Sequence, residues 1–124
     1  MSRGATNNFY AHLQTAADFL NTSVLVLDRF ARVCWCNSAA EALLGCSRRS
    51  LKGTDAGLFM PQVRQWVDKF SQKDAKYSPY SAVAELTRPM AEPESVHASI
   101  SQIAGSDGLL LLEIAEVEKA MKLA

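Results

Sequence analysis

The stretch from Ser23 to Gly45 constrains the fold more than any other part of the chain, because it holds the signals of strand, turn, strand and capped helix without a linker. Residues 24–27 are apolar and include two β-branched valines, and residues 28–31 supply a polar break. Residues 32–36 have the composition of a second strand. Two strands joined by so short a connection are expected to pair as an antiparallel hairpin.

A helix is predicted immediately after this hairpin. Asn37 has the side chain of a helix N-cap, and the residues that follow it are mostly alanine and leucine. Gly45 can adopt the left-handed backbone conformation that ends a helix. Ser47 then predicts a short capped helical turn through Leu51, after which a loop begins.

Both faces of the second strand are apolar. Strict alternation places Val33 and Trp35 on one face and Cys34 and Cys36 on the other. Two cysteines on one strand face do not easily form a disulfide, and their spacing is not the Cys-x-x-Cys of a zinc or redox motif. Together with Cys46 the chain has three cysteines, and the favoured interpretation is buried, reduced thiols in a cytosolic protein.

Length and charge exclude several classes of protein. At 124 residues, of which 48% are hydrophobic, the chain is expected to form one domain that needs no metal or disulfide. Thirteen basic and thirteen acidic residues balance, so there is no general electrostatic case for nucleic acid binding. A local basic patch at Arg48, Arg49 and Lys52 remains open, although its ordinary interpretation is a solvated face. The absence of a long apolar run or signal peptide predicts a cytoplasmic protein with no membrane contact.

Two further helices are predicted from apolar residues at helical spacing. The first precedes the hairpin and has a stripe formed by Phe9, Leu13 and Leu20. The second follows Pro61 and has a stripe formed by Val63, Trp66, Val67 and Phe70. This second helix is expected to pack on the sheet, with Trp66 and Phe70 either in the core or in the wall of a pocket.

Three further strands are predicted in the second half of the chain. Residues 80–88 are the least regular, since their Ala-Glu-Leu segment could equally be helical. Residues 95–103 alternate apolar and polar side chains, which is typical of a half-buried antiparallel strand. An Asp-Gly turn leads into residues 109–114, an apolar run expected to be a central strand. Residues 115–124 are helix formers, and coiled-coil spacing is seen at Ile114, Val117 and Met121.

Residues suited to catalysis or metal binding are scattered. His12 and His97 lie far apart, and neither has the neighbours of a metal site or a nucleophilic dyad. The chain contains no phosphate-binding glycine loop, no Gly-x-Ser-x-Gly and no His-Glu-x-x-His. The carboxylates of Asp28, Glu41 and Asp55 show no pairing of an acid with a base. No enzyme activity is therefore expected within these residues.

The run from Leu27 to Gly53, LDRFARVCWCNSAAEALLGCSRRSLKG, resembles the opening of a PAS domain. It has two strands, an Asn that begins a helix, a Gly that ends it, a short polar helix and a second Gly. The later elements follow the same order. The ending LLLLEIAEVEKAMKLA is similar to the region that leads out of the PAS domain in nitrogen-regulation sensor histidine kinases of the NtrB type.

This resemblance implies an α+β fold with a five-stranded antiparallel sheet of spatial order 2-1-5-4-3. Helices would pack on one face, an N-terminal amphipathic helix on the other, and an exit helix would end the chain. Residues 1–22 would be the leading helix, residues 23–115 the PAS domain, and residues 116–124 the start of the exit helix. The core or a ligand pocket would be lined by Val33, Trp35, Leu43, Trp66 and Phe70.

The function implied by the resemblance is that of a regulatory and dimerisation module in a cytoplasmic two-component sensor histidine kinase. The domain would form a homodimer and pass a signal to kinase domains outside this chain, with a regulatory protein as a further partner. Dimer contacts and signal relay are expected at Phe9, Leu13, Leu20, Ile114, Val117 and Met121. The alternative is a PAS interaction module of another signalling protein, such as a transcriptional activator or a cyclic-dinucleotide enzyme.

Two cofactor signatures of other PAS domains are missing from the sequence. Flavin-binding light sensors resemble one another in a Gly-x-Asn-Cys-Arg-Phe-Leu-Gln motif, whereas this chain has GCSRRSL from Gly45 onward. Haem-binding members supply a His from the helix after the loop, and residues 61–70 contain none. Neither flavin nor haem is therefore expected, while an unidentified small molecule in a modest cavity remains open.

Overall fold

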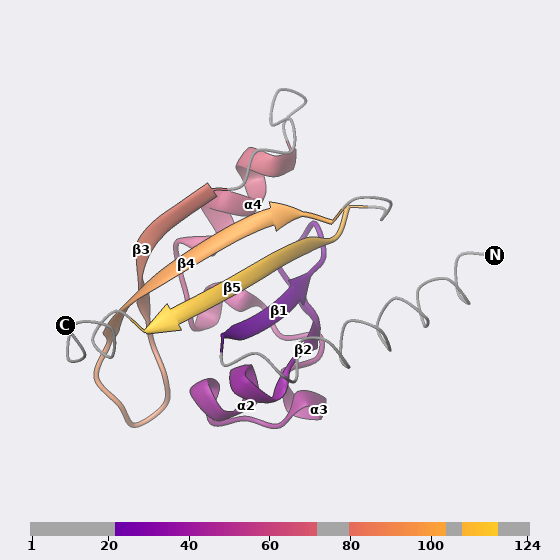
Figure 1. The fold of residues 1–124 in the computed structure, drawn as a ribbon. Helices are drawn as coiled ribbons and strands as arrows, with labels where there is room; N and C mark the ends of the chain where they lie inside the picture. Colours follow the sequence, from indigo (N-terminus) through magenta and orange to yellow (C-terminus); the bar gives the residue numbers. More distant parts are fainter. Residues whose placement is uncertain (1–21, 72–79, 104–107, 117–124) are drawn as a thin grey trace.

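The computed structural model describes residues 22–71, 80–103 and 108–116. Five strands form one sheet in the order β2-β1-β5-β4-β3, and every neighbouring pair is antiparallel (Figure 1). The strands are β1 Ser23–Leu27, β2 Val33–Cys36, β3 Tyr80–Leu86, β4 Glu94–Gln102 and β5 Leu110–Glu116. This confirms the predicted strand order. The predicted leading and exit helices lie almost entirely in residues 1–21 and 117–124, outside the described residues.

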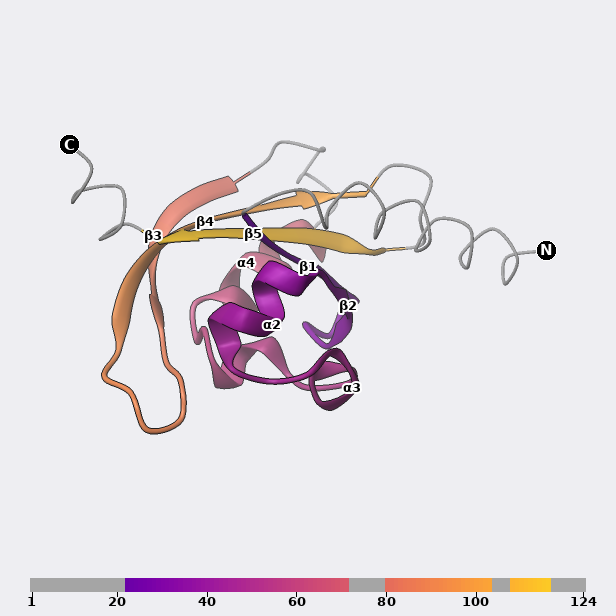
Figure 2. The same ribbon diagram turned by 60° about the horizontal axis from the view of Figure 1, so that its bottom comes forward.

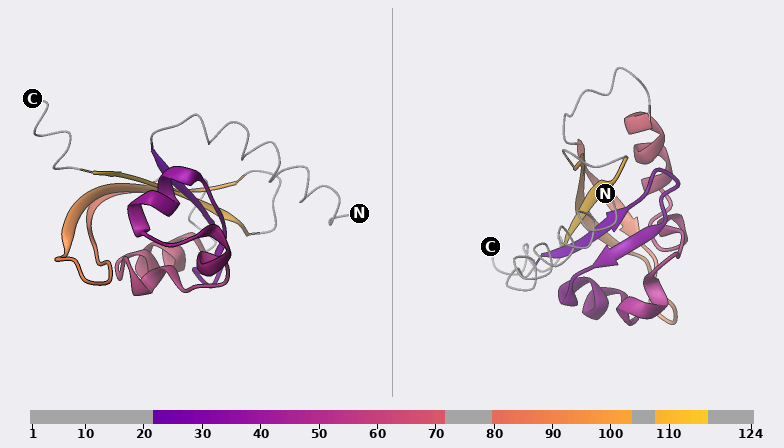
Figure 3. Two further views of the ribbon diagram at one scale, coloured as in Figure 1. Left: turned by 90° about the horizontal axis from the view of Figure 1, so that it is seen from below. Right: turned by 90° about the vertical axis from the view of Figure 1, so that its right-hand side faces the viewer.

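Every helix that the structure describes lies on the same face of the sheet (Figure 2). The helical segments are α2 Ser38–Leu44, α3 Arg48–Leu51, the 3₁₀ helix η1 Ala56–Leu58 and α4 Val63–Ser71. The side views in Figure 3 show the same two layers, with the β3–β4 connection bending toward the helices. That connection is held there because the backbone N–H of Thr87 donates to the carbonyl of Phe59 at 2.8 Å.

The predicted caps of α2 are confirmed. The side chain of Asn37 accepts a hydrogen bond from the backbone N–H of Ala40, as expected of an N-cap. Gly45 ends the helix at φ 68°, the left-handed conformation that glycine adopts without a steric penalty. The hairpin therefore leads into the helix without a linker, as the sequence predicts.

The second strand departs from strict alternation. Cys34 has no Cα partner in β1, whereas Val33, Trp35 and Cys36 each have one. This extra residue is a β-bulge, which sets two residues against one and reverses the alternation of side chains. Val33 and Cys36 consequently face the helices, while Cys34 and Trp35 face the opposite side. The prediction that Val33 shares a face with Trp35, and Cys34 with Cys36, is wrong for this reason.

The last strand is longer than predicted. β5 continues through Glu116 because β4 runs alongside it, with Val96 paired to Glu116. Ile114 therefore lies within the strand, is 2% exposed and belongs to the core on the helical side. Its assignment to a helical seam is wrong, since extended backbone does not have helical spacing. The other two seam residues, Val117 and Met121, lie outside the described residues.

The main core lies between the sheet and the helices. Its largest fully buried side chains come from four strands and from the η1–α4 connection: Leu25, Leu27, Met60, Leu86, Ile100 and Leu112. Burying one side chain of this size contributes about 1.5–3 kcal/mol relative to leaving it exposed. This face of the sheet is therefore closed by the chain's own helices. Within the described ranges, no helix combines the length and the apolar composition needed to cross a membrane.

Candidate functional site

Four of the five residues predicted to line the core or a pocket lie together on the helical side of the sheet. Val33, Leu43, Trp66 and Phe70 belong to the main core and are nearly inaccessible. Trp35 is buried to a similar extent, but the bulge in β2 places it on the other face. These four residues pack as core, and a role for them in holding a ligand stays a prediction.

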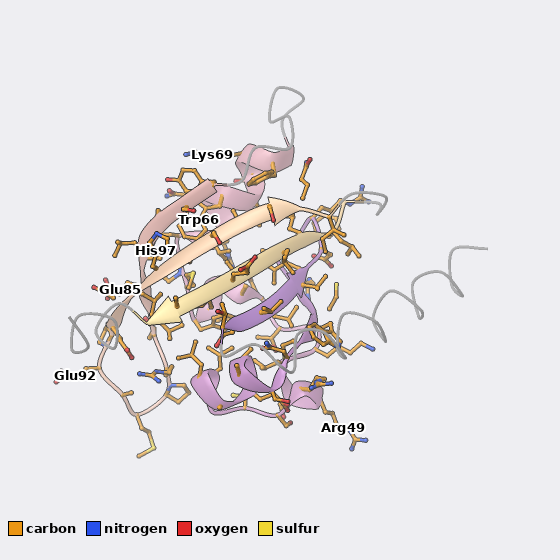
Figure 4. The ribbon with its side chains drawn as sticks, viewed as in Figure 1. Arg49, Trp66, Lys69, Glu85, Glu92 and His97 are labelled. Carbon is orange, nitrogen blue, oxygen red and sulfur yellow. The ribbon has the colours of Figure 1, made fainter. Side chains whose placement is uncertain are left out.

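α4 is held against the edge of the sheet by aromatic and polar contacts. The ring centroids of Trp66 and Tyr80 are 5.5 Å apart at an interplanar angle of 60°, and the ammonium of Lys69 lies 4.6 Å from the centroid of the Tyr80 ring (Figure 4). The side-chain amide of Gln102 donates to the carbonyl of Phe70 at 3.2 Å. These contacts tie the helix to β3 and β4 at once.

A second apolar cluster lies on the face of the sheet opposite the helices. It consists of buried Val24, Val26 and Trp35, against which partly buried side chains pack: Cys34, Ile103, Leu109 and Leu111. We call this the outer-face cluster. None of the described helices lies over it (Figure 2). Only its four partly buried members contribute accessible apolar surface, and exposed apolar surface marks interaction sites in soluble proteins.

The rest of the outer face is mostly polar, apart from Val83, which is 63% exposed. Along β3 and β4 it presents the exposed side chains of Ser81, Glu85, Ser95 and His97, of which Glu85 and His97 are labelled in Figure 4. His97 pairs across the strands with Val83 on one side and Ala115 on the other. The exposed position of His97 agrees with its predicted place on the polar face of its strand. The outer face is thus apolar over β2, β1 and the start of β5, and mostly polar over β3 and β4.

Arg48 connects the outer-face cluster to the helical side. Its guanidinium lies 5.5 Å from the centroid of the Trp35 ring, close enough for a cation–π interaction. Its backbone N–H donates to a carboxylate oxygen of Glu41 at 2.7 Å, and its side chain lies 3.5 Å from the other oxygen.

Burial and, to a smaller extent, the charge of Glu41 raise the pKa of the Cys36 thiol to about 11 against the opposing effect of Arg48. The thiol of Cys36 is therefore protonated at neutral pH.

Asn37 does more than cap a helix. Its side-chain oxygen accepts from the backbone N–H of Val24 at 3.0 Å as well as from that of Ala40. Its amide nitrogen donates to the carbonyl of Thr22 at 2.9 Å. One fully buried side chain thus joins the start of β1 to the start of α2. The sequence predicts the cap but offers no signal for the two bonds to β1 and the residue before it.

Arg88 is a structural residue that sequence reasoning missed. Its guanidinium donates to the carbonyl of Leu43 at 3.1 Å and pairs with the carboxylate of Glu94. It therefore joins the end of β3 to α2 and to the start of β4. The partner in α2 lies 45 positions away in the chain, so no local sequence pattern predicts the contact.

The described surface has hollows on three sides. One of about 190 Å³ lies among α2, α3, η1 and the residues after β3. Another of about 300 Å³ lies between α4, the β1–β2 turn and the start of β5. The third, of about 510 Å³, lies between β2 and α3. In the part of the chain that the structure describes, no group of three or more His, Cys, Asp or Glu side chains is placed to hold a metal ion.

Comparison with known proteins agrees with this architecture. Residues 11–77 match the family described as PAS domain. No curated protein sequence matches the chain. Among solved structures, the PAS domain of nitrogen regulation protein NR(II) from Vibrio parahaemolyticus is 15% identical, with a TM-score of 0.68, and the match covers 84% of this chain and 96% of that one.

Two other solved structures have the same fold. A domain of a sensory box sensor histidine kinase/response regulator from Geobacter sulfurreducens is 16% identical, with a TM-score of 0.67, and the match covers 90% of this chain and 94% of that one. The PAS domain, in complex with ethanol, of a LuxR-family transcriptional regulator from Burkholderia thailandensis is 14% identical, with a TM-score of 0.67 over 84% of this chain and 96% of that one. The family match spans more than half of the 124 residues. The chain belongs to the PAS domain family, whose members are sensory and interaction modules.

Proposed function

We propose that this PAS domain is the sensory and dimerisation module of a cytoplasmic two-component sensor histidine kinase that acts in nitrogen regulation. The observation that carries the proposal is the outer-face cluster, whose four partly buried apolar side chains lie on the side of the sheet that the described helices do not cover. The kinase context is supported by the similarity to the sensor histidine kinase domain and to the NR(II) PAS domain. The resemblance of the tail to NtrB-type kinases points the same way.

The partner that best fits the outer-face cluster is a second copy of the same domain. A two-fold dimer sets the same patch of each copy against the other, so an apolar patch is matched by an apolar patch. The stripe predicted in the leading segment, at Phe9, Leu13 and Leu20, would add apolar area to this contact. The polar half of the face, on β3 and β4, would form the rim of the interface.

Signal relay would run along β5. Leu111 belongs to the outer-face cluster, whereas its neighbour Leu112 belongs to the main core. The strand is hydrogen-bonded to β1 on one side and to β4 on the other, and it ends at Glu116, just before the predicted exit helix. A change in packing at the outer face would thus displace β5 and, with it, the segment that leads to the kinase domains. Such a switch requires two states that make different contacts.

Sedimentation equilibrium over a range of protein concentrations tests the dimer. The wild-type domain is expected to be dimeric, and Leu111→Ser is expected to raise the dimer dissociation constant at least about ten-fold, since a buried interface leucine is worth more than about 1.4 kcal/mol. Leu13→Ser and Leu20→Ser are expected to act in the same direction. Leu58→Ser is the matched control, because Leu58 is an exposed leucine, at 69%, in η1 on the helical side of the sheet. A monomeric wild-type domain at all concentrations would refute the dimerisation proposal.

The kinase assignment is tested on the full-length chain. A His-Glu-x-x-Asn-Pro-like stretch downstream of residue 124, and a phosphohistidine formed there with ATP, are the expected results. Phosphorylation that differs between nitrogen-rich and nitrogen-limited cells would support nitrogen regulation, and equal phosphorylation would refute it. A DNA-binding domain downstream instead would favour the second candidate, a transcriptional regulator, for which the similarity to the LuxR-family protein is the observation.

A further inference from the structure

The hollow between β2 and α3 has an unusual concentration of positive charge. It has a volume of about 510 Å³, and its lining includes the three cationic side chains of Arg32, Arg48 and Lys52. The carboxylate of Asp28 is the acidic group in the lining. The sequence marked Arg48, Arg49 and Lys52 as a local basic patch. The structure separates this set, because Arg48 and Lys52 line the hollow while Arg49 is exposed and projects away from it (Figure 4).

The acidic group in the lining is already engaged. One oxygen of the Asp28 carboxylate accepts from the backbone N–H groups of Phe30 and Arg32, at 2.8 and 3.0 Å, and so holds the turn between β1 and β2. A carboxylate that accepts two backbone hydrogen bonds is fixed in place, although it keeps its charge. Counting Glu41, which pairs with Arg48 from outside the lining, the three cations face two carboxylates, so the hollow keeps a small net positive charge.

The cations keep donors that the protein does not satisfy. The Nε–H of Arg48 is buried and has no hydrogen-bond partner, although another nitrogen of the same guanidinium lies 3.5 Å from Glu41. Arg32 makes one long bond of 3.4 Å to the carbonyl of Gly53, and Lys52 is exposed. An unsatisfied buried donor costs free energy, so an anion that drew the Arg48 guanidinium into the hollow would relieve that cost.

The remaining wall is apolar. It is formed by side chains of β2, among them Cys34 and Trp35, which the bulge sets side by side on one face. The volume falls in the range of small-molecule sites, which combine apolar walls with a few polar groups that fix orientation. The hollow therefore suits a ligand that has one strongly anionic end and one apolar end.

We propose that this hollow binds a small phosphate monoester, with the phosphate held by Arg32, Arg48 and Lys52 and the organic group placed beside Cys34 and Trp35. A phosphate carries close to two negative charges at neutral pH and three acceptor oxygens, which matches several cations better than the single charge of a carboxylate does. This site goes beyond the proposed function, because it would be a second input to the domain. It requires neither a dimer nor a kinase.

Phenyl phosphate is the probe, and the ¹H–¹⁵N signals of the Arg48 Nε–H and the Trp35 indole N–H are the readout. Saturable shifts of both signals are expected below about 10 mM, the range of a weak specific site. Arg32→Gln and Lys52→Gln are each expected to weaken binding roughly five-fold, since each removes one charge-assisted contact. Arg49→Gln, in α3 next to the lining residue Arg48, is the control and is expected to leave the affinity unchanged.

Three outcomes would overturn the proposal. The first is the absence of saturable shifts at either signal. The second is an equal loss of affinity in Arg49→Gln and Lys52→Gln, which would mean that only general surface charge attracts the probe. The third is equal binding of benzoate or phenol, which would remove the requirement for a phosphate. The outer-face cluster of the proposed dimer includes Cys34 and Trp35, so the titration is repeated on Leu111→Ser, which is expected to be monomeric. The absence of saturable shifts in both forms would overturn this proposal and leave the proposed function standing.

Discussion

The two faces of the sheet are both apolar, but they are completed in different ways. The helical face is covered by α2, α3, η1 and α4, and its core includes fully buried side chains from β1, β3, β4 and β5. The outer face has a smaller apolar cluster, with four of its seven members only partly buried, and a polar half on β3 and β4. One face therefore serves stability within the domain, and the other leaves four apolar side chains partly accessible.

This difference separates the effects expected of mutations. A substitution on the helical face removes contacts that fold the domain, so it should act on the free energy of unfolding. A substitution in the partly buried part of the outer-face cluster removes little intramolecular contact, so it should act mainly on association. Neighbouring residues on one strand point to opposite faces, which allows the comparison to be made with matched pairs.

The largest effect is expected for Leu112→Ala, compared with Leu111→Ala. Leu112 is fully buried in the main core, and its truncation should lower the free energy of unfolding by about 2–5 kcal/mol. Leu111, one position away, is partly buried on the outer face, and its truncation should cost below about 1.5 kcal/mol. Urea unfolding at a concentration where the domain is monomeric measures both. Equal losses would show that the two faces contribute alike to stability.

The next effect concerns the side chain that joins β1 to α2. Asn37→Ala removes the acceptor for the backbone N–H groups of Val24 and Ala40, and both hydrogen bonds lie in buried surroundings. A lost N-cap together with a buried unpaired donor should cost about 2–4 kcal/mol in the free energy of unfolding. Asn37→Asp is the matched control when both variants are measured at a pH at which this buried carboxyl is protonated, since it keeps the acceptor oxygen and its O–H can donate to Thr22 in place of the amide. A loss in Asn37→Ala no larger than that in Asn37→Asp would contradict the importance of the shared acceptor.

The third prediction tests the bulge through two cysteines. Cys36 faces the helices and its thiol has a pKa of about 11, so its thiolate fraction near neutral pH should be about 100-fold below that of an ordinary cysteine. Cys34 faces the outer side and is partly exposed. At a concentration where the domain is monomeric, iodoacetamide followed by peptide mass spectrometry should therefore modify Cys34 well before Cys36, and unfolding in urea should remove the difference. Equal rates in the folded domain would place both thiols on one face and disprove the bulge.

The bulge also shows where sequence reasoning stops. Local chemistry predicted the caps at Asn37 and Gly45, because each needs only one side chain or one backbone conformation. The alternation of β4 was also predicted, since polar and apolar residues take turns along it. In β2 all four residues are apolar, so the strand has no alternation of polar and apolar residues. A bulge that reverses which side chains face the helices therefore leaves no trace in the sequence.

The end of β5 was missed for a different reason. Residues 115 and 116 have helical propensity, yet pairing with β4 holds them in the strand, so a tertiary contact overrides the local preference. The basic patch at Arg48, Arg49 and Lys52 was seen as composition only. Its division into two lining residues and one exposed residue depends on how α3 packs beside β2, and the third cation, Arg32, comes from the end of the β1–β2 turn.

The smallest effect is expected at Asp55, on the helical side. Burial by itself raises the pKa of this carboxyl, but the N–H of Gly57 and the guanidinium of Arg64 outweigh it and hold the pKa below its usual value. A lowered folded-state pKa stabilises the domain above the unfolded pKa of about 3.9, and the effect is lost as the pH falls through the folded value. Asp55→Asn keeps an acceptor for Gly57, so it should cost below about 1 kcal/mol at pH 7 and nothing in strong acid. Urea unfolding of wild type and Asp55→Asn between pH 7 and strong acid measures the free energy of unfolding, with Asp68→Asn, at an exposed carboxylate, as the control. A loss of stability in Asp55→Asn that persisted unchanged in acid would show that the charge is not its cause.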